Sequence, residues 1–270
     1  MDDRPIGVFD SGFGGLTVAR AMIDLLPNEQ VVYVGDTGRY PYGPRPADEV
    51  RTFAAEIARY LVEAEDVKMV VVACNTAASV ALDELRFVFD VPVVGVIEPG
   101  LRSALRATRN GRVGVIGTVG TIASGAYQRS ATEMRSTAEV HCRACPGFVE
   151  FVERGEFDSD QVHVLAERLL SPLLASGVDT LLLGCTHYPF LARTIADVMG
   201  QDVVLVSSAE ETAFDVVTIL ASTGLGSRGP AKQQHRFLSS GDVGWFAEMG
   251  RRLLGPELAA AEPVHFDSPS

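Results

Sequence analysis

Two cysteines, Cys74 and Cys185, stand where a thiol can act as an acid or a base. Each ends a run of apolar residues and is followed at once by small hydrogen-bonding residues, Asn75-Thr76 in one case and Thr186-His187 in the other. A side chain directly after a buried parallel strand lies near turn amides and helix N-termini, which stabilise a thiolate. Either cysteine alone could be a buried core residue. Their matched placement favours a chemical role for both.

Two thiols on opposite sides of a substrate suit the inversion of a stereocentre next to a carboxylate. One base removes the proton from one face, and a protonated group delivers a proton to the other face. An unperturbed thiol pKa of about 8.5 lets cysteine serve in either form after a modest shift. A disulfide is the competing use, but thiols separated by a substrate lie too far apart to bond.

A glycine-rich turn at residues 10–15 follows the first apolar run. It can expose backbone amides to a carboxylate and hold Asp10 near the thiol of Cys74, or Asp10 can simply cap the next helix. The glycine spacing matches only half of a dinucleotide-binding loop. In a second turn, at residues 40–44, the hydroxyl of Tyr42 and the amide of Gly43 could bind an anion, although such turns are usually structural.

His187, two residues after Cys185, is a candidate acid/base partner for that thiol. Residues 145–153 carry two carboxylates, Glu150 and Glu153. Residue types alone do not choose between them.

The composition argues against a metal or an organic cofactor. Cys142 and Cys145, preceded by His141, form half of a zinc site, but no second ligand pair with suitable spacing exists. A pyridoxal-phosphate racemase needs a lysine for its Schiff base. Of the two lysines, Lys68 precedes a strand on the wrong side of the sheet and Lys232 is expected in a loop. We therefore expect a cofactor-free, metal-free mechanism.

The charge balance argues against nucleic acid or an anionic membrane as the main partner. The 270 residues include 35 acidic and 23 basic side chains, giving a net charge of −12. The acidic N-terminus lacks the features of a signal peptide, and the longest apolar run is too short for a membrane span. Four scattered cysteines do not form a disulfide framework. We expect a cytoplasmic protein with reduced thiols that acts on a small molecule.

Short, continuously apolar runs alternate with segments of helical periodicity, which predicts an α/β fold with buried parallel strands and sites at the strands' carboxyl ends. The predicted strands are Ile6–Phe9, Val31–Val34, Met69–Ala73, Val93–Val96, Val113–Ile116, Thr180–Leu183, Val203–Val206 and Arg236–Leu238. The predicted helices are Leu16–Leu26, Asp48–Glu63, Ala77–Phe87, Gln161–Ala175, Glu210–Ser222 and Val243–Leu254. We expect a loop over Thr223–Pro230 and a poorly patterned tail from Gly255.

The two halves of the chain resemble each other. The run at residues 6–12 aligns with that at 113–118, and residues 69–76 align with 180–187, so that a cysteine stands at the same strand end in both. This repetition predicts two similar, pseudo-symmetric α/β domains with mostly parallel sheets, facing each other across an active-site cleft. Residues 1–98 with 211–270 form the first domain, and residues 99–210 form the second.

Several motifs resemble those of the cofactor-independent aspartate/glutamate racemase superfamily, and of the glutamate racemases within it. They are FDSGFGGLTV from Phe9, GD at Gly35 with PYG at Pro41, ACNTA from Ala73 and GCTHYP from Gly184, with Cys145-Pro146 and Ser208-Ala209-Glu210 also in place. The match runs from about Ile6 to Ala213. One departure is Glu150, which stands where the family usually has a proline and puts the neighbourhood of Glu153 in question.

The resemblance implies conversion of L-glutamate to D-glutamate for bacterial peptidoglycan synthesis, and hence for the cell wall and cell shape. Cys74 and Cys185 would be the acid/base catalysts, with Asp10 assisting the first and His187 with Glu153 assisting the second. The substrate contacts it implies are Asp10, Ser11, Tyr42, Gly43, Asn75, Thr76, Thr118, Thr121, Thr186 and His187. Many members are homodimers with differing interfaces.

Two other functions remain open from the residues. The same fold could racemise aspartate or another acidic substrate. Alternatively, the three glycines within residues 12–15 could serve a nucleotide-binding or regulatory module.

Overall fold

The structure is a computed structural model that describes residues 1–229, 234–258 and 260–266, and its chain divides into two units. Unit 1 comprises Met1–Val96 and Ala209–Ser270, and unit 2 comprises Ile97–Ser208. These boundaries differ by two residues from the division expected from the sequence. Lys232, the end of the expected loop at Pro230, and residues 259 and 267–270 of the tail lie outside the described residues.

Unit 1 is built on a six-stranded sheet with the order β10-β9-β2-β1-β3-β4, in which every neighbouring pair is parallel. The strands are β1 (Ile6–Asp10), β2 (Val31–Gly35), β3 (Met69–Val72), β4 (Val93–Gly95), β9 (Arg236–Ser239) and β10 (Glu262–Pro263). Strands β1 to β4 are buried along their whole length, as their continuous apolar runs predicted.

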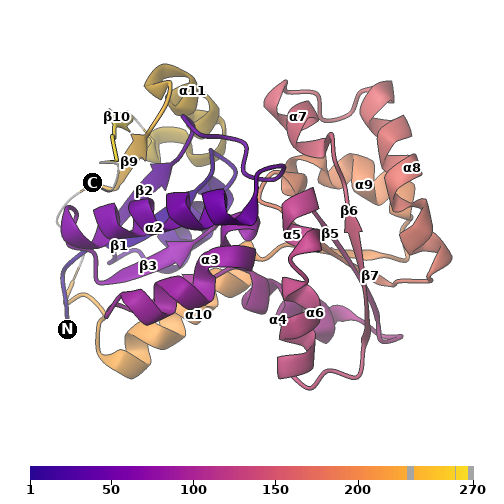
Figure 1. Ribbon diagram of the computed structural model, residues 1–270, viewed down its shortest axis with the longest axis horizontal. Coiled ribbons are helices and arrows are strands. Elements are labelled where there is room, and N and C mark those ends of the chain that lie inside the picture. Colours follow the sequence, from indigo (N-terminus) through magenta and orange to yellow (C-terminus); the bar gives the residue numbers. More distant parts are fainter. Residues whose placement is uncertain (230–233, 259, 267–270) are drawn as a thin grey trace. The chain divides into compact units, whose positions relative to one another are not determined.

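The helices of unit 1 are α1 (Leu16–Leu25), α2 (Ala47–Glu63), α3 (Asn75–Val88), α10 (Ala209–Thr223) and α11 (Val243–Leu254), followed by the short 3-10 helix η2 (Gly255–Glu257). The connection from β1 to β2 runs in one direction across the sheet, and those from β2 to β3 and β4 run in the other. Right-handed crossovers therefore place α1 on one face and α2 with α3 on the opposite face. Figure 1 shows α2 and α3 together in front of this sheet.

Unit 2 has a four-stranded parallel sheet with the order β6-β5-β7-β8. Its strands are β5 (Arg112–Gly117), β6 (Glu139–Ala144), β7 (Thr180–Gly184) and β8 (Val204–Val206). Its helices are α4 (Ile97–Ala107), α5 (Val119–Ala123), α6 (Ala126–Glu133), α7 (Phe148–Glu153), α8 (Asp160–Ala175), the 3-10 helix η1 (Tyr188–Leu191) and α9 (Ala192–Met199). In chain order this sheet repeats the arrangement β2-β1-β3-β4 of unit 1, so the internal repetition is real.

The mostly parallel α/β architecture is confirmed, but the sequence missed β6, β10 and several short helices. β6 is an edge strand whose residues are exposed or half-buried, so Glu139, His141 and Arg143 interrupt the apolar run that marks the other strands. The described part of the tail is also more ordered than expected, because Leu258 and Val264 are buried and β10 pairs with β9.

A buried ion pair joins separate segments of unit 1. The Lys68 ammonium group, fully buried just before β3, donates to the Glu29 carboxylate (2.5 Å), the Asp2 carbonyl (2.7 Å) and the Ser227 hydroxyl (3.2 Å). Lys68 thus lies at the amino end of the sheet, as its sequence position predicted. Among the described residues, no helix is both long and apolar enough to cross a membrane.

Candidate active site

The strand order locates the point in each unit where a ligand is expected to bind. In a parallel sheet of this type, successive crossovers reverse direction between the first and third strands, and the crevice beyond the carboxyl ends of those strands binds ligands. In unit 1 these strands are β1, which ends at Asp10 and is followed by Ser11, and β3, which is followed by Ala73 and Cys74. In unit 2 they are β5 and β7, followed by Thr118 and Cys185.

Cys74 is the N-cap residue of α3. Its thiol accepts a hydrogen bond from the Ala77 amide (3.5 Å). The same thiol donates a hydrogen bond to the Ser11 hydroxyl, with 3.7 Å between sulfur and oxygen. Only 5% of the residue is exposed. A helix N-terminus stabilises negative charge on the sulfur. The environment predicted for this thiol is therefore present.

Asp10 ends β1 and is fully buried. Its carboxylate accepts a hydrogen bond from the Gly12 amide (2.9 Å), whereas α1 begins after Gly15 without any side-chain cap. The alternative that Asp10 caps this helix is therefore wrong. A Cβ atom on Gly15 would lie 2.5 Å from the Cβ of Asp10 and 3.0 Å from that of Ala73, so the glycine lets the start of α1 lie close to both strand ends.

Asn75 and Thr76 form the first turn of α3 and are both almost fully buried. Together with Asp10, Ser11 and Cys74 they form what we call the Cys74 cluster. It combines a thiol, a carboxylate, hydroxyls and an amide at one end of the sheet.

Tyr42 and Asp36 belong to a buried hydrogen-bond network beside this cluster. Asp36 is fully buried and accepts hydrogen bonds from the Tyr42 hydroxyl, from Arg39 Nε (2.8 Å) and from the Ser240 hydroxyl (2.5 Å). Burial and the Asp36 charge raise the pKa of the Tyr42 phenol well above its ordinary value. Because the phenol donates its hydrogen bond to Asp36, an anion at this turn would be bound by backbone amides such as that of Gly43.

Arg39 is occupied within unit 1. Its guanidinium group forms ion pairs with Asp36 and Glu56 and lies 4.1 Å from the centroid of the Phe53 ring. These partners hold the cation in the network that supports the Tyr42 turn.

Cys185 follows β7 and is 7% exposed. Its carbonyl accepts a hydrogen bond from the Tyr188 amide (3.1 Å), which closes a turn that leads into the 3-10 helix η1. The predicted turn amides are therefore present, but no α-helix begins directly after this thiol. The two cysteines occupy equivalent strand ends in different local backbones.

His187 and Glu153 form a hydrogen-bonded pair close to Cys185 in the chain, which is an ion pair when the imidazole is protonated. The Nε2 atom of His187 lies 2.9 Å from Oε1 of Glu153, and its Nδ1 atom lies 3.5 Å from the Thr186 hydroxyl. The His187 side chain is 3% exposed. Glu150 lies on the same helix but is exposed, so the structure selects Glu153 where the residue types alone did not.

Thr118 and Thr121 follow β5, next to the end of β7. Their hydroxyls are 2.9 Å apart, and Thr118 caps α5 through the Thr121 amide (3.2 Å). The glycines before Thr118 and Cys185 pair with each other across the sheet. Thr118, Thr121, Glu153, Cys185, Thr186 and His187 form what we call the Cys185 cluster.

The other two cysteines, Cys142 and Cys145, lie in surroundings that disfavour the thiolate form. Burial raises the pKa of Cys142 to about 11 and that of Cys145 to about 12. Cys142 lies within β6, and no group of three or more His, Cys, Asp or Glu side chains suited to hold a metal occurs in the described part of the chain.

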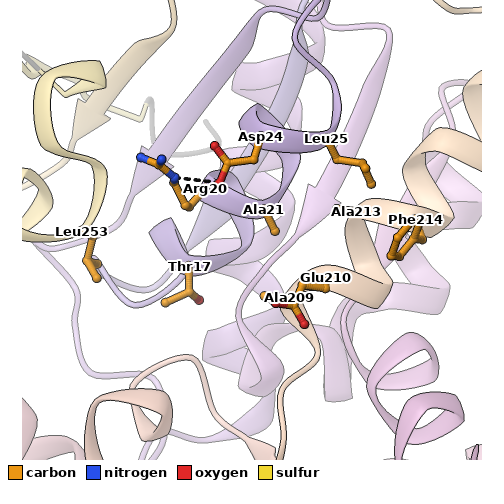
Figure 2. Close-up of a pocket in the computed structure, with 10 residues that line it drawn as sticks. All are labelled: Thr17, Arg20, Ala21, Asp24, Leu25, Ala209, Glu210, Ala213, Phe214 and Leu253. Atoms are coloured by element: carbon orange, nitrogen blue, oxygen red, sulfur yellow. Dashed lines mark hydrogen bonds and ion pairs between the residues drawn. The ribbon is translucent and has the colours of Figure 1, made fainter.

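A separate pocket of about 510 Å³ lies on unit 1 between α1, α10 and the end of α11 (Figure 2). Its lining includes Leu25 and Phe214, with an ion pair between Arg20 and Asp24. None of the predicted site residues lines it. We therefore do not assign the chemistry to this pocket.

Sequence patterns do not single out two residues of the Cys74 neighbourhood. Asp36 belongs to the GD motif that begins at Gly35, and Tyr33 lies within a predicted strand. Tyr33 is fully buried, and its hydroxyl donates to the Gly12 carbonyl (3.0 Å). The available signal was a phenol in an otherwise aliphatic buried strand, because a buried hydroxyl must find a hydrogen-bond partner.

Comparison with known proteins decides the family. The family model described as Asp/Glu/Hydantoin racemase matches residues 6–213. The chain belongs to this racemase family. The prediction of an amino-acid racemase, and hence an isomerase, is confirmed.

Individual relatives cover the whole racemase chain. A glutamate racemase from Corynebacterium diphtheriae is 52% identical, with 97% of this chain and 98% of the relative covered. The crystal structure of a glutamate racemase isoform from Bacillus anthracis has a TM-score of 0.92 at 42% identity, covering 100% of this chain and 99% of that one. A glutamate racemase from Francisella tularensis in complex with D-glutamate has a TM-score of 0.89 at 32% identity, covering 99% and 98%.

Proposed function

We propose that this racemase interconverts L- and D-glutamate without a cofactor, using Cys74 and Cys185 on opposite faces of the same α-carbon. The observation that carries the proposal is the equivalent placement of the two thiols, each within two residues of the end of the third strand in its unit. The glutamate racemases that match the full chain support glutamate as the substrate.

The two thiols would exchange roles with the direction of the reaction. A thiolate removes the α-proton from one face, the resulting carbanion is planar, and the opposite thiol protonates the other face. Each turnover leaves one thiol protonated and the other ionised, in the reverse of their starting states. Before the next turnover in the same direction, both thiols must return to their starting states by exchanging protons with solvent, so the α-proton of the product comes from the solvent.

Each thiol has its own assisting group. Asp10 would assist Cys74, whose sulfur also lies at the N-terminus of α3. On the other side, His187 would assist Cys185, and Glu153 would fix the imidazole and stabilise its protonated form. The two catalytic groups thus differ in chemistry although the strands that carry them are equivalent.

The substrate would be held by hydroxyls, amides and turn backbone. The residues in this role are Asp10, Ser11, Tyr42, Gly43, Asn75, Thr76, Thr118, Thr121, Thr186 and His187. Hydroxyl and amide donors can bind two carboxylates without a buried arginine. For Tyr42 the contribution would come from the backbone, because its phenol is bound to Asp36.

We further propose a cytoplasmic homodimer that supplies D-glutamate for peptidoglycan synthesis. The small-molecule substrate requires neither nucleic acid nor a membrane. The acidic net charge of −12 is consistent with this assignment.

Isotope incorporation tests the two-thiol mechanism. L-Glutamate incubated with the protein in deuterated water should give D-glutamate that carries deuterium at the α-carbon from the first turnovers, while recovered L-glutamate stays protonated. Cys74→Ser and Cys185→Ser should each lower racemisation by at least about a hundredfold, because each face needs its own acid/base group. Full activity in either variant would refute the pairing.

The same assay separates the alternatives. Faster turnover of L-aspartate than of L-glutamate would assign the site to aspartate. Tight nucleotide binding without α-proton exchange would favour a nucleotide-binding module. That alternative is weakened by the Gly12 amide and carbonyl, which are both bonded within unit 1.

A further inference from the structure

Tyr33 stands behind the Cys74 cluster and touches the turn that carries two of its members. Its hydroxyl donates to the carbonyl of Gly12 (3.0 Å), and the amide of the same glycine donates to the Asp10 carboxylate (2.9 Å). The preceding residue, Ser11, places its hydroxyl 3.7 Å from the Cys74 sulfur. The phenol therefore restrains Gly12 through its carbonyl, and the amide of this same residue, which follows Ser11, orients the Asp10 carboxylate.

The ring of Tyr33 is held by its own surroundings. It stacks on Phe246 with centroids 6.0 Å apart and an interplanar angle of 19°, and it lies 6.4 Å from the Phe237 ring. A Cβ atom on Gly15 would approach the hydroxyl to 2.9 Å, and a Cβ atom on Gly35 would approach the Gly12 carbonyl to 2.6 Å. The phenol and the Gly12 carbonyl thus each pack closely against glycine backbone.

The hydroxyl acts as a hydrogen-bond donor in this position. Burial raises the pKa of Tyr33 well above its ordinary value, and charge on Asp10 or Cys74 raises it further. The phenol therefore keeps its proton whatever the ionisation state of the thiol. It does not itself take part in proton transfer.

We propose that Tyr33 is a positioning residue for the Cys74 half of the reaction, holding the Gly12 carbonyl so that Asp10 and Ser11 keep their places beside the thiol. This inference rests on the proposed two-thiol function and extends it to a residue outside the Cys74 cluster. Small displacements of groups that transfer protons slow the chemical step strongly, by up to about a hundredfold for about 1 Å.

Tyr33→Phe tests the inference, because it keeps the packed ring and removes only the hydroxyl. We expect kcat to fall roughly tenfold with KM changed by less than about twofold. The deciding measurement is the primary isotope effect with α-deuterated glutamate of each enantiomer. It should increase for the enantiomer whose proton Cys74 removes and decrease for the other, because only one of the two proton transfers has become slower.

Isotope effects do not depend on how much of the sample is folded, so they remain informative if Tyr33→Phe is less stable. Tyr60→Phe is the matched control, because it loses a hydroxyl bonded to Glu65 (2.6 Å) at the far end of α2 and should leave both isotope effects unchanged. Unchanged isotope effects in Tyr33→Phe, or the same changes in Tyr60→Phe, would overturn the inference alone. Absence of α-proton exchange by the wild-type protein would overturn the proposed function and the inference together.

Discussion

At the scale of single residues, the two thiols have different neighbours. Cys74 lies at a helix N-terminus in a cluster with a buried carboxylate, whereas Cys185 is followed by a turn and lies in a cluster with the His187–Glu153 pair. A helix terminus provides a fixed field, while an imidazole can itself gain or lose a proton near neutral pH. Substitutions around the two thiols should therefore affect the reaction in different ways.

The glutamate beside His187 gives a direct test of this difference. Glu153→Gln should lower kcat about tenfold, because a neutral amide stabilises the protonated imidazole less than a carboxylate does. Glu150→Gln, on the exposed side of the same helix, should leave kcat unchanged. Steady-state racemisation assays of the two variants make the comparison, and equal losses in both would contradict the role of the ion pair.

Residue types alone identified the thiols but not all of their partners. Glu150 and Glu153 are one helical turn apart, so choosing between them required either the family resemblance or the position of His187 in space. The contact between Tyr33 and Gly12 joins residues 21 positions apart, and no local pattern predicts it. Local sequence shows which groups can do chemistry, whereas tertiary packing decides which of them meet.

At the scale of elements, close packing at the ends of the strands determines where the residues that follow them lie. A Cβ atom on Gly184 would lie 2.6 Å from the Ile116 carbonyl and 2.8 Å from the Tyr127 hydroxyl. The strand that precedes Cys185 must therefore end in glycine to lie against β5.

Buried apolar runs predicted the central strands well, because a strand covered on both faces excludes polar residues. They could not predict β6, which lies at an edge.

The turn between α4 and β5 gives unit 2 a pH-dependent element. Burial alone would raise the pKa of Asp179, but hydrogen bonds from the Thr108 hydroxyl and the amides of Arg109 and Asn110 outweigh it and lower the pKa to about 2. Because the folded pKa lies below the unfolded one of about 3.9, this stabilisation is complete above about pH 4 and is lost as the pH falls toward 2.

The Asp179→Asn variant should show this dependence by difference. The gap in the free energy of unfolding between wild type and variant should be constant near neutral pH and should shrink as the pH falls from about 4 toward about 2. Urea titrations at several pH values measure the gap. Thr108→Val, which removes the 2.6 Å hydrogen bond, should reproduce part of the effect. If the difference in the free energy of unfolding between wild type and Asp179→Asn grew at low pH, the predicted direction of the pH dependence would be wrong.

At the scale of the whole molecule, unit 1 is assembled from two distant parts of the chain. The ion pair between Lys68 and Glu29 joins these parts, because both side chains also bond to Ser227, which follows α10. A lysine that was excluded as a Schiff-base residue thus has a structural role.

Removing the cation should destabilise unit 1. Lys68→Met leaves the Glu29 carboxylate, which is 4% exposed, without its partner and should cost about 3–5 kcal/mol. The double variant Lys68→Met/Glu29→Gln should recover part of this loss. Arg252→Met is the matched control, because its ion pair with Glu248 is exposed at 59% and 67% and should contribute less than about 1 kcal/mol. Urea unfolding measures all three, and equal losses at both ion pairs would contradict the prediction.

The discontinuity of unit 1 also sets an order of events during synthesis on the ribosome. β2 pairs with β1 on one side, but its other neighbour, β9, begins at Arg236. All of unit 2 is therefore translated while β2 still presents an unpaired strand edge. Unit 2 is contiguous and can fold as soon as it emerges, whereas unit 1 must keep an open edge until its last quarter arrives. That interval is when the nascent chain is most exposed to pairing with the wrong strand.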